Sequence, residues 1–217
     1  MCGRYSIGAE IETLAQMLDV KVPEDFEPNY NAAPSQKLPV VSNHQPSSFR
    51  LYPWGIVPFW AKADQKRLIN ARAETILEKA TFKKSFKTRR CLVAADGYYE
   101  WMKNKGGKVP YRICLENDKP FVFAGIWDAP DEDEGQAGFC IITTAASPSV
   151  AHIHDRMPVI LHPEAISIWL SDTEDYEGLQ DMLRPMEDKL IKAYPVSKQV
   201  NSVQNNDSSL RVPQSAS

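Results

Sequence analysis

The second residue of the chain is a cysteine, and its position gives it unusual chemistry. A small residue after the initiator methionine is the usual condition for removal of that methionine, so we expect a mature chain that begins at Cys2. A terminal cysteine carries an α-amine with a pKa of about 7.7–8.0 and a thiol with a pKa of about 8.5. With an aldehyde, the amine gives a Schiff base and the thiol closes onto the imine carbon to form a thiazolidine. With an acyl group, the thiol attacks and the amine acts as its base. The alternative is an incidental residue in an unstructured N-terminus.

Two other segments contain residues suited to proton transfer. Glu100 lies in the aromatic run Tyr98–Trp101, and apolar neighbours raise the pKa of a carboxyl group toward the range used in acid–base catalysis. The alternative is a glutamate that points to solvent from an aromatic strand. His154 opens the run His154–Arg156, which places an imidazole, a carboxylate and a guanidinium in consecutive positions. A structural histidine with satisfied hydrogen bonds is the alternative there.

Polar, aromatic and basic residues elsewhere suit contact with a ligand. Asn70 and Arg72 precede a helical pattern, where such a pair either caps the helix or projects an amide and a guanidinium into a site. The stretch Trp54–Trp60 contains three aromatic residues, a glycine and a proline, which indicates either a ligand-facing corner or core packing. Five basic residues lie between positions 83 and 90. Such a run is more typical of a solvated face than of a binding site, although it could extend a groove.

Composition bounds the class of protein. A chain of 217 residues with 43% hydrophobic content can bury a core as one domain, and a net charge of −3 argues against non-specific coating of nucleic acid. No run of 18 apolar residues and no signal-like N-terminus occur, so we expect a cytoplasmic protein without a membrane span. The four cysteines form no CxxC pair, and the histidines have no metal-ligand spacing beyond His152 and His154. We therefore expect no metal and no cofactor.

The apolar periodicity predicts mostly strands, with a few helices. Helices are expected over residues 9–20, from about 73 to 86, and over Pro163–Leu170 and Tyr176–Leu183. Strands are expected over Leu38–Val41, Phe49–Val57, Cys91–Ala95, Val109–Leu115, Lys119–Ile126, Gly138–Thr144, the segment that ends at Leu161, and Leu190–Val200. The proline-punctuated segment around residues 29–34 is predicted to be a loop. Short turns between consecutive strands favour antiparallel pairing. The fold class is α+β: a predominantly antiparallel twisted sheet or barrel-like core with peripheral helices, in one domain over residues 1–207 with a disordered tail over 208–217.

Seven short motifs occur in order along the chain. They are Met1-Cys2-Gly3-Arg4-Tyr5, Tyr30-Asn31-Ala32-Ala33-Pro34, Trp54-Gly55-Ile56-Val57-Pro58, Asn70-Ala71-Arg72-Ala73-Glu74, Gly97-Tyr98-Tyr99-Glu100-Trp101, Thr143-Thr144-Ala145-Ala146 and His154-Asp155-Arg156-Met157-Pro158. Together they resemble the SOS-response-associated peptidase (SRAP) family, whose members crosslink to abasic sites in single-stranded DNA. The matches extend from residue 2 to about residue 207, so the resemblance implies a single SRAP domain with the SRAP fold.

The resemblance implies a role for each site residue. Cys2 would form the Schiff base and the thiazolidine, Glu100 would shuttle protons, His154 would act on the sugar hydroxyl or the developing charge, and Asn70 would orient the terminal residue. The basic residues at matching positions would hold phosphates, and further motif residues would contact the strand or stack its bases. The expected DNA-binding residues are Arg4, Asn31, Trp54, Trp60, Arg72, Thr143 and Arg156.

The implied activity is covalent shielding of abasic sites, with self-processing that removes Met1 and with a weak AP-lyase activity through β-elimination. The implied partner is single-stranded DNA with abasic sites, bound by a monomer that joins the nucleoid on damaged DNA. Two alternatives stay open. A cysteine-dependent peptidase or amidohydrolase would use Cys2, Glu100 and His154 but would have no use for three arginines. A non-catalytic single-strand-binding module would capture DNA equally well after Cys2→Ala.

Overall fold

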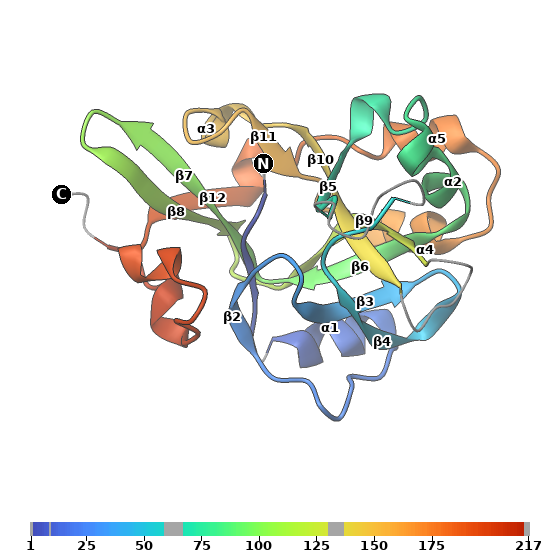
Figure 1. Cartoon of the computed structure of the whole chain (residues 1–217), viewed down its shortest axis with the longest axis horizontal. Helices are drawn as coiled ribbons and strands as arrows, with labels where there is room; N and C mark the ends of the chain where they lie inside the picture. The colour runs from blue at the N-terminus through green and yellow to red at the C-terminus, as the bar shows by residue number, and fades with distance from the viewer. Residues whose placement is uncertain (1, 9, 59–66, 130–136, 215–217) are drawn as a thin grey trace.

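The computed structural model describes residues 2–8, 10–58, 67–129 and 137–214, and strands form most of its regular structure (Figure 1). The strands are β1 (Tyr5–Ile7), β2 (Asn29–Ala32), β3 (Lys37–Ser42), β4 (Gln45–Pro53), β5 (Asn70–Arg72), β6 (Arg90–Ala95), β7 (Gly97–Asn104), β8 (Gly107–Leu115), β9 (Phe121–Asp128), β10 (Gly138–Ala145), β11 (Arg156–Pro158) and β12 (Ile191–Pro195). One sheet has the order β12-β8-β7-β1-β2, and the other has the order β11-β10-β9-β6-β3-β4 with β5 beside β10. All these pairs are antiparallel except β5 with β10. The α+β, mostly antiparallel prediction is therefore confirmed.

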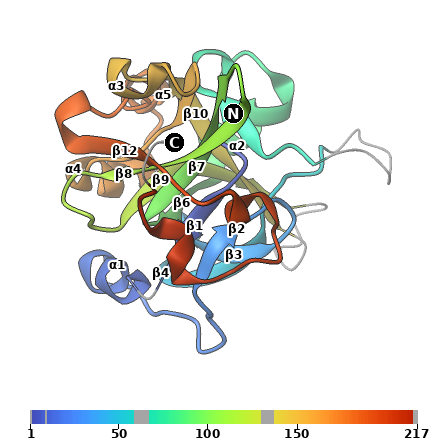
Figure 2. The ribbon, with the colours of Figure 1, turned by 90° about the vertical axis from the view of Figure 1, so that its left-hand side faces the viewer.

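The helices lie at the periphery of the sheets (Figures 1 and 2). They are α1 (Ile11–Leu18), α2 (Ala80–Thr88), α3 (Pro148–Ala151), α4 (Pro163–Leu170) and α5 (Tyr176–Asp181), with 3-10 turns η1 (Ala73–Thr75), η4 (Asp188–Leu190), η5 (Lys198–Asn201) and η6 (Ser208–Arg211). Helix α1 buries Ile11 and Leu14, three positions apart on one face. It ends where Asp19 adopts a left-handed conformation with φ 52° and its N–H bonds to carbonyls of the last turn.

The core fills the space between the two sheets. Phe123 of β9 lies between Tyr5 of β1 and Tyr98 of β7, with ring centroids 5.8 Å and 6.1 Å away. Strand β6 is buried along its whole length. It lies close to β9 because Gly125 has no side chain: a Cβ there would come within 2.8 Å of the Cys91 sulfur. The sheet that carries β1 is thus held against the sheet that carries β5 and β10.

Two residues of the basic run belong to the interior. Arg90 is 1% exposed, and its guanidinium donates to main-chain carbonyls at the ends of α2 and α4, including those of Phe86 and Trp169. Arg89 forms an ion pair with Asp128. These two side chains therefore stabilise the packing of helices on β6 and β9, and only the lysines of the run face solvent.

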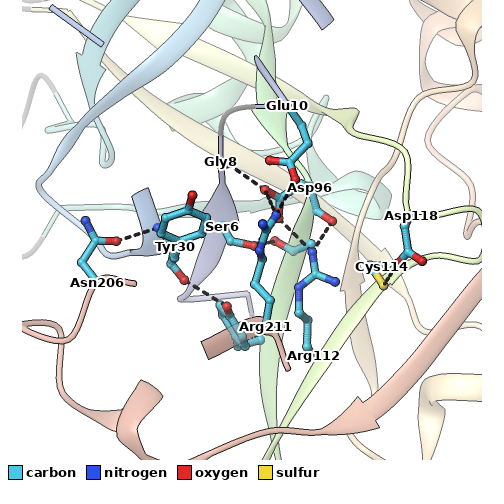
Figure 3. Close-up of polar contacts among 12 residues, drawn as sticks. Ser6, Gly8, Glu10, Tyr30, Asp96, Arg112, Cys114, Asp118, Asn206 and Arg211 are labelled. Atoms are coloured by element: carbon cyan, nitrogen blue, oxygen red, sulfur yellow. Dashed lines mark hydrogen bonds and ion pairs between the residues drawn. The ribbon is translucent and has the colours of Figure 1, made fainter. Parts of the chain in front are cut away.

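A buried carboxylate joins the N-terminal strand to distant parts of the chain (Figure 3). Asp96 is 1% exposed and accepts hydrogen bonds from the Ser6 hydroxyl and the Gly8 N–H. Arg112 donates to one of its oxygens at 2.9 Å and Arg211 to the other at 3.1 Å. We call these five residues the Asp96 cluster. The cluster fixes β1 from both the sheet and the C-terminal segment.

The predicted disorder after residue 207 is wrong for residues 208–214. Residues 208–211 form η6, Leu210 is fully buried beside Val200, and Arg211 also donates to Glu10 at 2.8 Å. Polar composition suggested disorder, but one apolar anchor and one arginine supply tertiary contacts that order the segment. Residues 215–217 lie outside the described residues.

Three other element predictions need correction. The predicted loop around residues 29–34 contains β2, because its prolines flank the strand rather than interrupt it. The helical pattern that ends near Phe86 divides into β5, η1 and α2, so Asn70 and Arg72 lie in a strand that pairs with β10 rather than at a helix entrance. The last predicted strand stops at Pro195, and η5 follows it.

Candidate active site

Cys2 lies just before β1 and is fully buried. The side-chain amide of Asn70, in β5, donates to the Cys2 carbonyl at 2.8 Å. Strand β5 of the seven-stranded sheet therefore holds Cys2, which leads into β1 of the five-stranded sheet. This is the contact by which Asn70 would orient Cys2. Figure 1 shows this end of the chain between the β7–β8 hairpin and the β10–β11 pair.

Glu100 lies on β7, two residues after Tyr98, so the two side chains share a face of the strand. The residue is 5% exposed, and burial raises the pKa of its carboxyl group, while the nearby His154 partly offsets this rise. The predicted rise is confirmed, and the solvent-facing alternative is wrong. Burial also raises the pKa of the Cys2 thiol, and the charge of Glu100 adds to that effect. The resting thiol is therefore protonated, and it donates to the Arg4 carbonyl, whose oxygen lies 3.9 Å from the sulfur.

His154 lies in the turn before β11, and its side chain is 30% exposed. Its Nδ1 accepts a hydrogen bond from the Arg156 N–H at 3.0 Å and lies 2.9 Å from a carboxylate oxygen of Asp155. A neutral ring that accepts at Nδ1 carries its proton on Nε2. When the ring is protonated, Asp155 can accept from Nδ1 instead. The same geometry thus supports both a neutral donor and a cation at this position.

The three arginines expected to hold phosphates have different surroundings. Arg72 is exposed on β5. Arg4 is half-buried, and its Nη1 donates to Asn31 Oδ1 at 2.7 Å and to the Val200 carbonyl at 2.8 Å. Arg156 is held by Thr143, to whose carbonyl its Nη2 donates at 2.6 Å. The register of β5, β10 and β11 brings Arg72, Thr143 and Arg156 to one end of the seven-stranded sheet.

Trp54 does not provide the expected surface for stacked bases. Trp54 is fully buried, its indole N–H donates to the Ile69 carbonyl at 3.0 Å, and its ring lies parallel to that of Phe139. Trp54 is therefore a core residue, as the core-packing alternative predicted. A fully buried ring cannot stack on a base without rearrangement. Trp60 lies outside the described residues.

Asn31 and Thr143 are also interior residues. Asn31 is 1% exposed, and its amide donates to the carbonyls of Ser202 and Asn205 at 2.8 Å each. Thr143 is fully buried in β10. Asn31 thus holds the C-terminal segment, and the Thr143 carbonyl holds Arg156; the DNA contacts expected of these two residues stay predictions.

Sequence reasoning missed two tyrosines on the face that carries Glu100. Tyr5 and Tyr98 are register partners on β1 and β7, and both hydroxyls are buried with no hydrogen-bond partner among the described residues; the same holds for Oδ1 of Asn70. Buried polar atoms are normally paired, so a group of such atoms indicates a place where a ligand can supply the partner. The two-residue spacing of Tyr98 and Glu100 on one strand was the sequence signal that could have placed Tyr98 on the same face as Glu100.

No group of three metal-ligating side chains occurs within the described ranges. His152, one of the two histidines considered for a metal, packs edge-on against the ring of Tyr111. Among the helices of the described chain, none has the length and apolar content needed to cross a membrane.

Comparisons with known proteins agree with the fold and place the chain in a family. A family profile described as SOS response associated peptidase (SRAP) matches residues 1–203, and the chain therefore belongs to this family. It is 38% identical to the abasic site processing protein YoqW of Bacillus subtilis, over 97% of this chain and 98% of the relative. It is 34% identical to the abasic site processing protein YedK of Escherichia coli, over 98% and 100%. A crystal structure from Bacteroides thetaiotaomicron superposes with a TM-score of 0.84 at 25% identity, over 98% of this chain and all of the other.

Proposed function

We propose that this protein processes abasic sites in single-stranded DNA by forming a covalent thiazolidine through Cys2. The observation that carries the proposal is the placement of Cys2, which is held through its carbonyl by Asn70 and lies close enough to the buried Glu100 for that carboxylate to raise the pKa of the Cys2 thiol. Relatives over nearly the full length are named abasic site processing proteins, which supplies the substrate class.

The first step is hydrolysis of the peptide bond between Met1 and Cys2, with water as the second reactant. This self-processing is the peptidase activity that the family description suggests. It frees the α-amine of Cys2, which is the nucleophile needed for the aldehyde. A chain that keeps Met1 has a thiol but no free amine at this position, so it cannot form the thiazolidine.

The second step joins the aldehyde of the open abasic sugar to Cys2. The amine adds to the carbonyl carbon, and the resulting carbinolamine loses water to give the imine; Glu100, with its raised pKa, donates the proton to the departing hydroxyl. The thiol then adds to the imine carbon, while its proton passes through Glu100 to the imine nitrogen. The balance is one aldehyde and one aminothiol giving one thiazolidine and one water.

His154 and the arginines would place the strand. His154, with its proton on Nε2, can donate to the sugar hydroxyl or to charge that develops on the ring-opened sugar. Arg4, Arg72 and Arg156 supply guanidinium groups for phosphates, with Arg72 the most exposed of the three. Binding through these three cations predicts an affinity that falls with salt, with a slope of log affinity against log salt of about −2 on a single strand.

The imine has a second fate. Loss of a proton from the carbon next to the imine, with departure of the 3′ phosphate, breaks the strand by β-elimination. Closure of the thiol onto the same carbon competes with this loss, so we propose that lyase activity is weak in the native chain. It should increase when the thiol is absent but the amine remains.

The test is intact-mass spectrometry of the purified chain after incubation with single-stranded DNA that contains one abasic site. We expect loss of Met1 and an adduct that equals chain plus DNA minus one water and that needs no reducing agent to persist. Cys2→Ala keeps an amine but no thiol, so it should give an adduct only after borohydride reduction. An undamaged strand is the second control. A processed Cys2 without an adduct would contradict the proposal and favour a peptidase acting on other substrates.

A further inference from the structure

The guanidinium group of Arg156 is already occupied by a carboxylate. Glu74 lies in η1, directly after β5, and its two oxygens accept from the two terminal nitrogens of Arg156 at 2.6 Å and 2.9 Å. This paired arrangement is the geometry in which arginine also binds a phosphate. The hydrogen bond from Arg156, together with the nearby positive charge of Arg72, lowers the pKa of Glu74, so the carboxylate is ionised at neutral pH.

The two partners differ in their freedom to move. The Arg156 side chain is 15% exposed and is also fixed by the Thr143 carbonyl, whereas the Glu74 side chain is 50% exposed. Besides its bonds to Arg156, the Glu74 carboxylate accepts from its own main-chain N–H, so rotation into solvent breaks no contact that the described residues show with another side chain. The guanidinium would then keep its orientation and present two donors to an incoming phosphate.

We propose that Glu74 is a specificity-determining residue that competes with DNA phosphates for Arg156 and weakens the binding of undamaged single strands. The inference rests on the proposed function of the site. An undamaged strand must displace Glu74 through phosphate contacts alone. A strand joined to Cys2 remains at high effective concentration beside Arg156, so it displaces Glu74 without the need for strong initial affinity. The competition thus favours damaged over undamaged DNA.

The decisive comparison is between Glu74→Gln and Glu78→Gln, both in a Cys2→Ala background that removes the thiazolidine. Glu78 is exposed four positions later and has no ion pair within the described part of the chain, so the control makes the same change in net charge without touching Arg156. Fluorescence anisotropy with a labelled undamaged oligonucleotide gives the affinity at a series of salt concentrations. Circular dichroism and urea unfolding confirm that both variants are folded.

We expect Glu74→Gln to bind the undamaged strand about threefold to tenfold more tightly than its parent. The slope of log affinity against log salt should become steeper by about 0.7, the value for one additional phosphate contact on a single strand. Glu78→Gln should change the affinity less than twofold. Equal effects of the two variants would overturn the proposal, and weaker binding by Glu74→Gln would show that Glu74 positions Arg156 instead of competing for it.

A second assay separates this inference from the proposed function. In chains that keep Cys2, an undamaged competitor strand should inhibit crosslinking to an abasic strand more strongly in Glu74→Gln than in Glu78→Gln. If the parent crosslinks and all three chains respond equally to competitor, the role of Glu74 is wrong while the proposed function stands. If the parent forms no adduct, the proposed function is wrong, and the anisotropy titration still decides whether Glu74 competes with phosphate.

Discussion

The two faces of the five-stranded sheet at β1 and β7 differ in how the buried oxygens of Asp96, Tyr5 and Tyr98 are paired. On the face of the Asp96 cluster, both oxygens of Asp96 accept hydrogen bonds from several donors (Figure 3). On the face that carries Glu100, the hydroxyls of Tyr5 and Tyr98 are buried without partners among the described residues. Paired buried groups stabilise a fold, whereas unpaired ones lower its stability and persist where function needs them. The difference supports a structural role for one face and the proposed reactive role for the other.

The largest expected effect is on the structural face. Asp96→Ala would leave Arg112, which is 5% exposed, as a buried charge without its carboxylate, and we expect the free energy of unfolding to fall by about 3–5 kcal/mol. Urea unfolding measures this loss. Asp181→Ala is the control, because its side chain is 79% exposed with only a distant ion pair, and it should change stability by less than about 0.5 kcal/mol. A comparable result for both variants would contradict a structural role for the cluster.

The next effect separates activity from stability on the reactive face. Glu100→Gln should slow crosslinking about a hundredfold at neutral pH with unchanged affinity for undamaged strands, as followed by single-turnover gels and anisotropy. Equal loss of both would indicate that Glu100 is structural.

The same variant should be more stable than the parent at pH 7 but not at pH 4. Burial raises the pKa of Glu100 in the folded chain, so its contribution to stability is complete below about 4.3, the ordinary value. That contribution is lost as the pH rises through the raised folded value, where the unfolded chain ionises more readily. Glutamine does not ionise and therefore escapes the loss. Urea unfolding at the two pH values checks the sign.

A smaller effect is expected at the C-terminal end of the Asp96 cluster. Arg211→Ala removes the donor shared by Glu10 and Asp96, and we expect a loss of about 1–2 kcal/mol. Hydrogen exchange should report faster opening of η6 and of β1 together. Arg184→Ala, whose side chain is 75% exposed, is the matched control. Faster exchange in η6 alone would show that the segment does not support β1.

The smallest effect compares adjacent tyrosines on opposite faces. Tyr99 donates its hydroxyl hydrogen to the Tyr30 carbonyl at 2.9 Å, so Tyr99→Phe should lower stability by about 1 kcal/mol. Tyr98→Phe removes a buried hydroxyl that has no partner among the described residues, so stability should stay the same or rise by up to about 1 kcal/mol. Thermal unfolding of the two variants side by side measures the difference in sign. Equal losses would mean that the faces are alike.

Much of the sheet and part of the site could be predicted from sequence. Period-two alternation located most strands, and the aromatic neighbours of Glu100 correctly indicated a raised pKa. The aromatic run at Trp54 could not be assigned, because large apolar side chains occur both in cores and on base-stacking surfaces. Asn31 looked like a contact residue, since nothing local shows that the carbonyls to which its amide donates lie more than 160 residues away. The pairing of Glu74 with Arg156 could not be predicted for the same reason, because the two residues lie far apart in the sequence.

The ion pairs of Arg211 also have a consequence for how the chain is made. They span 201 residues to Glu10 and 115 to Asp96, so β1 obtains its last partners only after about 200 further residues have been translated. At 5–20 residues per second, that interval is roughly ten to forty seconds. The N-terminal strand is thus synthesised early, but its tertiary contacts are completed only when the last residues have been added. Under the proposed function, Met1 masks the amine of Cys2 from aldehydes in the cell for as long as it stays attached, while the ribosome finishes the fold.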